Sequence, residues 1–205
     1  MNALEPMAIN DWRRRTFELY AAVRAGDDPE AAWHTWRDGR DALFAHHPAS
    51  PLPEAARPGF AGLPYHDYDR SLRVPAELAG VEPLEVDLDS SDGQSYRFVR
   101  FAVARFALAE RECELDLYWL LGYAGGLFLP FADATSGATT YGAGRYLLDT
   151  VKGADLGIER DLVVLDFNFA YNPSCSYDAR WSCPLSPPRN RLPVAVTAGE
   201  LTPTG

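Results

Sequence analysis

The chain has 205 residues, of which 47% are apolar, so it can bury one hydrophobic core without disulfides or a structural metal. It carries 29 acidic residues against 19 lysines and arginines, and this negative excess disfavours binding to nucleic acid or to an anionic membrane surface. The first ten residues contain no basic segment followed by an apolar one, so we expect no secretory signal and a cytoplasmic protein.

Two amphipathic helices are predicted at the start of the chain. Asn10 is a suitable N-cap for a helix over residues 11–25, where apolar side chains recur every three or four positions. Asp28 is followed by proline and glutamate, which is typical of the first turn of a second helix. Trp33 and Trp36 belong to the apolar stripe of this second helix, and we expect them to pack rather than to hold a cofactor.

A proline-rich connector follows the helices. Prolines recur throughout residues 48–75, which excludes a continuous helix and favours an extended segment laid over a sheet. We therefore expect residues 1–70 to form a helical arm with its connector and residues 71–205 to form a β-sheet domain, the two together making one compact unit.

Alternating and β-branched runs predict about seven strands after the connector. The clearest run is 112–120, where Cys113, Leu115, Leu117 and Trp119 alternate with more polar positions and are expected in the core. The other strands are expected at 70–80, 83–88, 96–108, 127–131, 146–150, 162–169 and 194–197. Pro130 indicates an edge or a bulge in its strand.

Two helices followed by a series of strands predict an α+β fold. We expect a curled, mostly antiparallel sheet that forms a roll or a partly open barrel, with the helices to one side.

Several segments of the chain form a distinctive pattern, the centre of which, after residue 166, is dense in Asn, Tyr, Pro and Cys. They are residues 127–137, 140–147, 166–177, 181–185 and 190–194, together with 50–52 and 60–65. These segments resemble a family of bacterial and archaeal proteins known only as the domain of unknown function number sixteen-eighty-four. The resemblance implies membership of a family without an assigned activity. Arg189 departs from the family pattern, which has an acidic residue before the asparagine.

A turn that ends at Arg145 is the first candidate site. Two glycines precede this arginine, and its planar guanidinium suits a carboxylate or phosphate. We assign Asp133, Thr140 and Arg145 as ligand-binding residues and Tyr141 as a hydrogen-bond donor. The alternative is a tight turn in which Arg145 pairs with Asp133 or Asp166.

The end of the predicted 162–169 strand is the second candidate site. Asp166 and Asn168 continue the face of the strand that is apolar earlier on, and a sheet commonly opens into a site at such a point. The candidate ligand-binding residues here are Asn168, Asn172, Cys175 and Cys183. The alternative is that Asp166 and the asparagines form Asx turns that hold the following loop.

Cys175 and Cys183 leave several interpretations open. Seven residues separate them, whereas zinc ligands are usually closer, and we predict no metal site. A nucleophilic thiol, a mutual disulfide and plain packing of two thiols remain as alternatives. His66, in the connector, could reach Asp166 as a proton-transfer group if the connector folds over the sheet.

The preferred hypothesis is a pocket at the edge of the sheet that binds a small polar molecule, for which we favour an anion. If catalysis follows, Arg145 orients the ligand, Asp166 or His66 transfers a proton, and Tyr141 or Tyr171 donates a hydrogen bond to a developing oxyanion. The alternative is a non-catalytic protein that docks a partner through its N-terminal helices. The sequence identifies no cofactor, reaction or oligomeric state.

Overall fold

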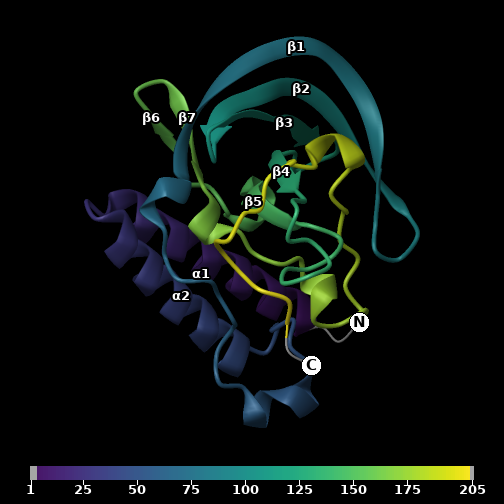
Figure 1. Ribbon diagram of the computed structural model, residues 1–205. Helices are drawn as coiled ribbons and strands as arrows, with labels where there is room; N and C mark the ends of the chain where they lie inside the picture. Colours follow the sequence, from purple (N-terminus) through teal and green to yellow (C-terminus); the bar gives the residue numbers. More distant parts are fainter. Residues whose placement is uncertain (1–3, 204–205) are drawn as a thin grey trace.

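The computed structural model describes residues 4–203, and it begins with the two predicted helices. Helix α1 spans Glu5–Ala25 and helix α2 spans Pro29–His46, and the two lie side by side below the sheet (Figure 1). The start predicted for α1 is wrong because Asn10 lies inside the helix, whose first turn contains a proline with a suitable φ. Asp28 caps α2 as predicted, by accepting hydrogen bonds from two backbone amides of the first turn.

Seven strands form one antiparallel sheet in the order β5-β4-β3-β2-β1-β7-β6. The strands are β1 (Arg73–Asp89), β2 (Ser95–Leu108), β3 (Arg111–Leu120), β4 (Leu127–Phe131), β5 (Arg145–Asp149), β6 (Ile158–Glu159) and β7 (Leu162–Asp166). Strands β1, β2 and β3 arch over the molecule, and the sheet remains open (Figure 1). The predicted α+β fold with a curled sheet is therefore confirmed, but the sheet does not close into a barrel.

Short 3-10 helices interrupt the connections between these elements. They span Glu54–Gly59, Arg70–Leu72, Thr150–Lys152, Phe167–Phe169, Ser174–Ser176 and Pro188–Asn190. The first of them lies in the proline-rich connector, which is thus not extended over its whole length. No helix within residues 4–203 combines the length and the apolar character needed to cross a lipid bilayer.

Three strand predictions need correction. Residues 73–80 and 83–88 belong to the single strand β1, which continues through an irregularity between Gly80 and Leu84, whereas residues 70–72 form a 3-10 helix before it. Strand β7 ends at Asp166, because the chain then turns into a 3-10 helix. Residues 194–197 are extended but lie outside the sheet. Pro130 lies at a bulge in β4, which is an interior strand, so the bulge rather than the edge explains this proline.

The sheet packs against a separate core on each of its two faces, although much of β1 is exposed. A shift of register in β2 between Arg100 and Ala102 makes this possible, because a bulge moves the following side chains to the other face. Phe98, before the shift, packs in an aromatic core with the helices, whereas Phe106, after it, packs in an aliphatic core inside the arch. Trp119, predicted in the core, is 44% exposed near the end of β3.

The aromatic core fastens α2 to the sheet. Trp33 and Trp36 are almost fully buried, and the indole nitrogen of Trp33 donates a hydrogen bond of 2.8 Å to the Asn168 carbonyl. Arg40, one turn further along, forms a buried ion pair with Glu200, with Nη2 and Oε2 3.2 Å apart. The C-terminal segment, coloured yellow in Figure 1, therefore joins the helices to the interior of the arch.

Candidate functional site

Arg145 is fully buried, and protein atoms occupy its guanidinium. Nη2 lies 2.9 Å from Oδ2 of Asp133 and donates to the Val196 carbonyl at 3.1 Å. Nη1 donates to the carbonyl of Ala198 and, at 3.3 Å, to that of Glu200. Burial lowers the pKa of Arg145, and the charge of Asp133 opposes this effect. The guanidinium thus binds backbone carbonyls of the C-terminal segment, which a neighbouring strand would bind if the segment were part of the sheet.

Asp133 and Thr140 belong to the same buried network. Oδ1 of Asp133 accepts hydrogen bonds from the amide and the hydroxyl of Thr135 at 2.7 and 2.6 Å. The hydroxyls of Thr135 and Thr140 lie 2.8 Å apart, and Thr140 is fully buried. These contacts correspond to the alternative of a tight turn in which Arg145 pairs with Asp133.

Asp166 and Asn168 hold the connector against the end of β7. The Asn168 amide group makes two hydrogen bonds of 2.8 Å to the backbone of Asp69, one as acceptor and one as donor. Oδ1 of Asp166 accepts from the backbone and side-chain nitrogens of Asn168 at 3.0 and 2.8 Å. Oδ2 of Asp166 has no hydrogen-bond partner within residues 4–203, and burial raises the pKa of this carboxyl to about 6.

Asp166 borders a small cavity of about 150 Å³ together with Arg73 and Glu159. His66 lies elsewhere, in a shallow hollow formed by the connector with Glu30 and Thr197. Burial lowers the pKa of His66, and the nearby charge of Arg145 adds to this. The structure therefore assigns His66 and Asp166 to different hollows.

Asn172 and Tyr171 follow the 3-10 helix and face the C-terminal segment. The Asn172 side chain donates a hydrogen bond of 2.7 Å to the Leu201 carbonyl, and its backbone amide donates to the carboxylate of Glu200. Tyr171 is buried, with the guanidinium of Arg40 5.0 Å from its ring centre. Both residues make contacts that join the loop to neighbouring segments.

Within residues 4–203, Arg145, Asp166 and Cys183 do not line one common cavity as predicted. Arg145 is enclosed in the buried network, Asp166 borders the small cavity beside Arg73, and Cys183 lines a third hollow.

The third hollow, which we call the Cys183 pocket, has a volume of about 280 Å³. Its walls come from α1, β2, β3, β4, the turn after β5 and the loop that contains Cys183. The lining residues are Ile9, Arg13, Tyr96, Phe98, Leu120, Gly126, Leu127, Phe128, Asp149, Val151, Lys152, Ser174, Trp181, Ser182, Cys183 and Pro184. It combines an aromatic wall with a few charged groups, as small-molecule sites commonly do.

Two cations and one carboxylate line the Cys183 pocket. Nζ of Lys152 lies 3.1 Å from Oδ2 of Asp149, and the Lys152 side chain is 39% exposed. Burial, the largest single effect, opposes the charged form of Lys152, but Asp149 and Cys183 together raise the pKa of the amine. Arg13 is exposed and forms no ion pair within the described residues. One positive charge is therefore left without a counter-ion at the pocket.

Cys183 lines this pocket, Cys175 contacts it from the neighbouring loop, and both are free thiols. The Cys175 amide donates to Sγ of Cys183 over 3.4 Å, and the Tyr141 hydroxyl lies 4.0 Å from Sγ of Cys175. A hydrogen bond from the Cys183 thiol is the main cause that lowers the pKa of Cys175 to about 6; burial opposes it, and the Tyr141 hydroxyl contributes further. The side-chain hydrogen bond that the Cys183 thiol makes to Cys175, together with burial, raises the pKa of Cys183.

Backbone pairing fixes the loop that carries Cys183. Ser90 and Pro184 form an antiparallel bridge, and the Leu185 amide donates a hydrogen bond of 2.8 Å to the Asp89 carbonyl. The Cys183 amide donates to the Ser91 hydroxyl at 3.1 Å. The turn between β1 and β2 therefore positions the thiols although it is distant in sequence.

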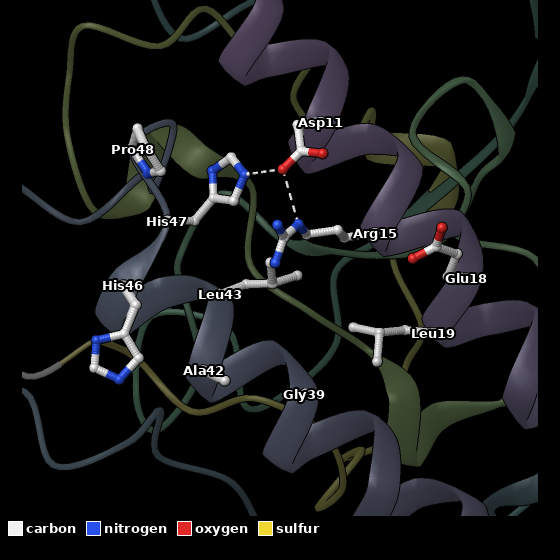
Figure 2. Close-up of a pocket in the computed structure, with 10 residues that line it drawn as sticks. All are labelled: Asp11, Arg15, Glu18, Leu19, Gly39, Ala42, Leu43, His46, His47 and Pro48. Atoms are coloured by element: carbon white, nitrogen blue, oxygen red, sulfur yellow. Dashed lines mark hydrogen bonds and ion pairs between the residues drawn. The ribbon is translucent and has the colours of Figure 1, made fainter.

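A larger hollow of about 650 Å³ lies between the two helices (Figure 2). Its most buried polar group is His47, whose Nε2 lies 3.1 Å from Oδ2 of Asp11 and whose Nδ1 accepts from the Ala49 amide at 3.1 Å. Arg15 also pairs with Asp11, at 2.8 Å. The hydrogen bond from His47 is the main cause that lowers the pKa of Asp11, with Arg15 contributing further. These groups already satisfy one another, so the hollow offers little unpaired chemistry.

Sequence reasoning identified the two thiols but not Arg13, Lys152 or Trp181 as pocket residues. Trp181 lies in one of the segments that resemble the family, and this resemblance is the sequence signal that could have identified it as a pocket residue. No local pattern distinguishes Arg13 or Lys152 from other surface cations.

Comparison with known proteins gives a family without an assigned activity. Residues 58–201 match the family model described as "Protein of unknown function (DUF1684)". The solution NMR structure of an uncharacterized protein from Haloarcula marismortui is similar, with 38% sequence identity and a TM-score of 0.62. The alignment covers 84% of this chain and 94% of that chain. No curated protein matches the chain.

Proposed function

This chain belongs to the DUF1684 family of proteins of unknown function, and we propose that it binds a small anionic molecule with an apolar body in the Cys183 pocket. The observation that carries the proposal is the pairing of an aromatic wall with a cation that has no counter-ion. This keeps the predicted class of ligand but moves its site away from Arg145 and Asp166.

The size of the pocket limits the ligand. A volume of about 280 Å³ lies near the lower end of the range of about 300–1,000 Å³ typical of ligand sites. Tyr96, Phe98 and Phe128 offer ring surfaces to a flat apolar group. A small aromatic or short aliphatic acid fits these properties better than a nucleotide does.

The charges favour an acid. Arg13 presents a planar fork of donors that suits a carboxylate or phosphate, and Lys152 adds a second ammonium donor beside Asp149. Apart from Ile9 and Arg13, every lining residue lies within the segment that matches the family model. This supports the pocket over the hollow between the helices, whose lining residues all precede residue 58.

The alternative, docking of a partner through the helices, receives less support. Trp33 and Trp36, the largest apolar side chains of α2, are buried against the sheet and offer no surface to a partner. Substituting either one would therefore test stability rather than docking.

Thermal unfolding with a panel of small molecules tests the proposal. Benzoate and phenyl phosphate should each raise the free energy of unfolding by about 2.7 kcal/mol when present at 100 times their Kd. Uncharged benzamide at the same concentration should raise it less. Arg13→Ala should weaken this effect at least several-fold. Arg14→Ala is the matched control, since Arg14 lies on the same helix, pairs with Asp11 and is 63% exposed.

Two results would contradict the proposal. One is equal stabilisation by acids and by benzamide. The other is an equal response of the Arg13→Ala and Arg14→Ala variants, because both lose one positive charge from α1 and only the first loses it from the pocket.

A further inference from the structure

Cys175 and Cys183 differ in their surroundings although they are in contact. Cys183 is 1% exposed and receives the Cys175 amide at its sulfur, whereas Cys175 is partly exposed beside Tyr141. The Tyr141 hydroxyl lies 4.0 Å from the Cys175 sulfur, and the Ser91 hydroxyl accepts a hydrogen bond from the Cys183 amide. Buried structural cysteines are commonly packed by apolar groups, as Cys113 is in the aliphatic core.

We infer that Cys175 and Cys183 form a thiol–disulfide exchange site that reacts with low-molecular-weight disulfides, with Cys175 as the attacking thiol and Cys183 as the resolving thiol. The inference goes beyond the proposed binding of an acid and does not require it. It rests on the 3.4 Å approach of the Cys175 amide to the Cys183 sulfur, the unequal exposure of the two cysteines and the Tyr141 hydroxyl beside Cys175.

The first step is attack by the Cys175 thiolate on one sulfur of the external disulfide. A bond forms between Cys175 and that sulfur, the external sulfur–sulfur bond breaks, and one external thiolate leaves with the electron pair. A hydrogen bond from the Tyr141 hydroxyl favours the thiolate before the attack, because it stabilises the negative charge.

The second step is attack by Cys183 on the Cys175 sulfur of the mixed disulfide. The hydrogen bond to the Cys175 thiolate is the main reason for the raised pKa of Cys183. By this step the Cys175 sulfur is part of the mixed disulfide and no longer carries a negative charge. The positive charge of Lys152 lowers the pKa of Cys183 and becomes relatively more important at this stage. Cys183 gives its proton to solvent, and the second external thiolate leaves. Two protein thiols are thus oxidised to one disulfide while one external disulfide is reduced to two thiols.

The test uses 4,4′-dithiodipyridine, an uncharged disulfide whose released thiopyridone is measured by absorbance. The reduced full-length protein should release two equivalents in one fast phase and retain no pyridyl group. Cys183→Ser should release one equivalent and retain one pyridyl group on Cys175. Cys175→Ser should react at least about tenfold more slowly, because Cys183 is buried. Cys113→Ser is the matched control and should behave as the wild type.

A peptide map of the oxidised wild type keeps the test independent of the folding of any variant. It should show a disulfide between the peptides of Cys175 and Cys183. The inference is overturned if the wild type keeps a bound pyridyl group, or if Cys175→Ser reacts as fast as the wild type. The reagent is uncharged and so does not depend on the proposed acid site. A failure of the exchange reaction therefore leaves the proposed binding of acids untouched, and a failure of acid binding leaves the proposed exchange reaction untouched.

Discussion

Replacement of Arg145 by methionine tests whether this buried guanidinium is structural. The substitution keeps an unbranched side chain of similar length but removes the charge beside Asp133 and the donors to three backbone carbonyls. Breaking a buried ion pair by removing one partner costs about 3–5 kcal/mol, because a buried charge is left uncompensated. Asp133 keeps its donors from Thr135 and Val196, which moderates this cost.

We expect Arg145→Met to lower the free energy of unfolding by about 4 kcal/mol. In a domain of this size, each 1 kcal/mol corresponds to about 2–4 °C in Tm, so Tm should fall by about 10 °C. Urea unfolding followed by circular dichroism measures the first quantity, and calorimetry measures the second.

The control is Arg105→Met in strand β2. Arg105 faces Glu114 at 3.9 Å across the sheet, and both side chains are more than 60% exposed. An exposed pair contributes about 0–1 kcal/mol, so this variant should unfold nearly as the wild type does. If Arg145→Met costs no more than Arg105→Met, the buried network does not hold the C-terminal segment, and a ligand-binding role for Arg145 becomes open again.

Three further predictions concern titratable groups. Alkylation of Cys175 by iodoacetamide should rise with pH through a midpoint near 6, and Tyr141→Phe should move that midpoint upward; a midpoint above 8 would contradict the assigned hydrogen bonds. Asp166 has its pKa raised to about 6 by burial, so the folded state holds the proton more tightly than the unfolded state, and stability due to this group falls as pH rises from about 4 to 6. The loss is about 3 kcal/mol, and Asp166→Asn should abolish it in urea unfolding at pH 4.5 and 7.5; parallel pH profiles would contradict this account. Glu200→Gln should cost about 3 kcal/mol in urea unfolding because it leaves Arg40 without its buried partner, and a loss below about 1 kcal/mol would show that the pair is dispensable.

Local signals made several parts of the fold predictable. Asp28 followed by proline predicts the start of α2, because a side-chain cap and a fixed φ act within one turn. Turn residues 89–93 separate the alternating run 83–88 from the β-branched and aromatic run 96–108, which is typical of a hairpin, and β1 and β2 form this hairpin in the structure. In both cases the contacts that decide the structure are close in sequence.

The C-terminal segment shows where such reasoning fails. Val194 and Val196 are both buried, and their alternation resembles that of a strand. The segment nevertheless lies outside the sheet, because Arg145 supplies donors to its carbonyls in place of a neighbouring strand. The pairing of Arg145 with Asp133 was a stated alternative, but the carbonyl contacts more than 50 residues away were beyond any local pattern.

The Cys183 pocket was beyond prediction for the same reason. Its lining comes from segments between Ile9 and Pro184, and no period or motif links Arg13 in α1 with Lys152 after β5. The two cysteines were recognisable as candidates because cysteine has few structural uses in a chain without a disulfide framework. Their contact with each other required the fold.

Titration of isotope-labelled protein with benzoate, followed by NMR of backbone amides and indole groups, tests the central claim most directly. The account predicts saturable shifts of the Trp181 indole and of the amides of Lys152 and Cys183, and loss of these shifts in Arg13→Ala. Shifts confined to the groove between α1 and α2, around His47 and Asp11, would contradict it, and so would the absence of any saturable shift.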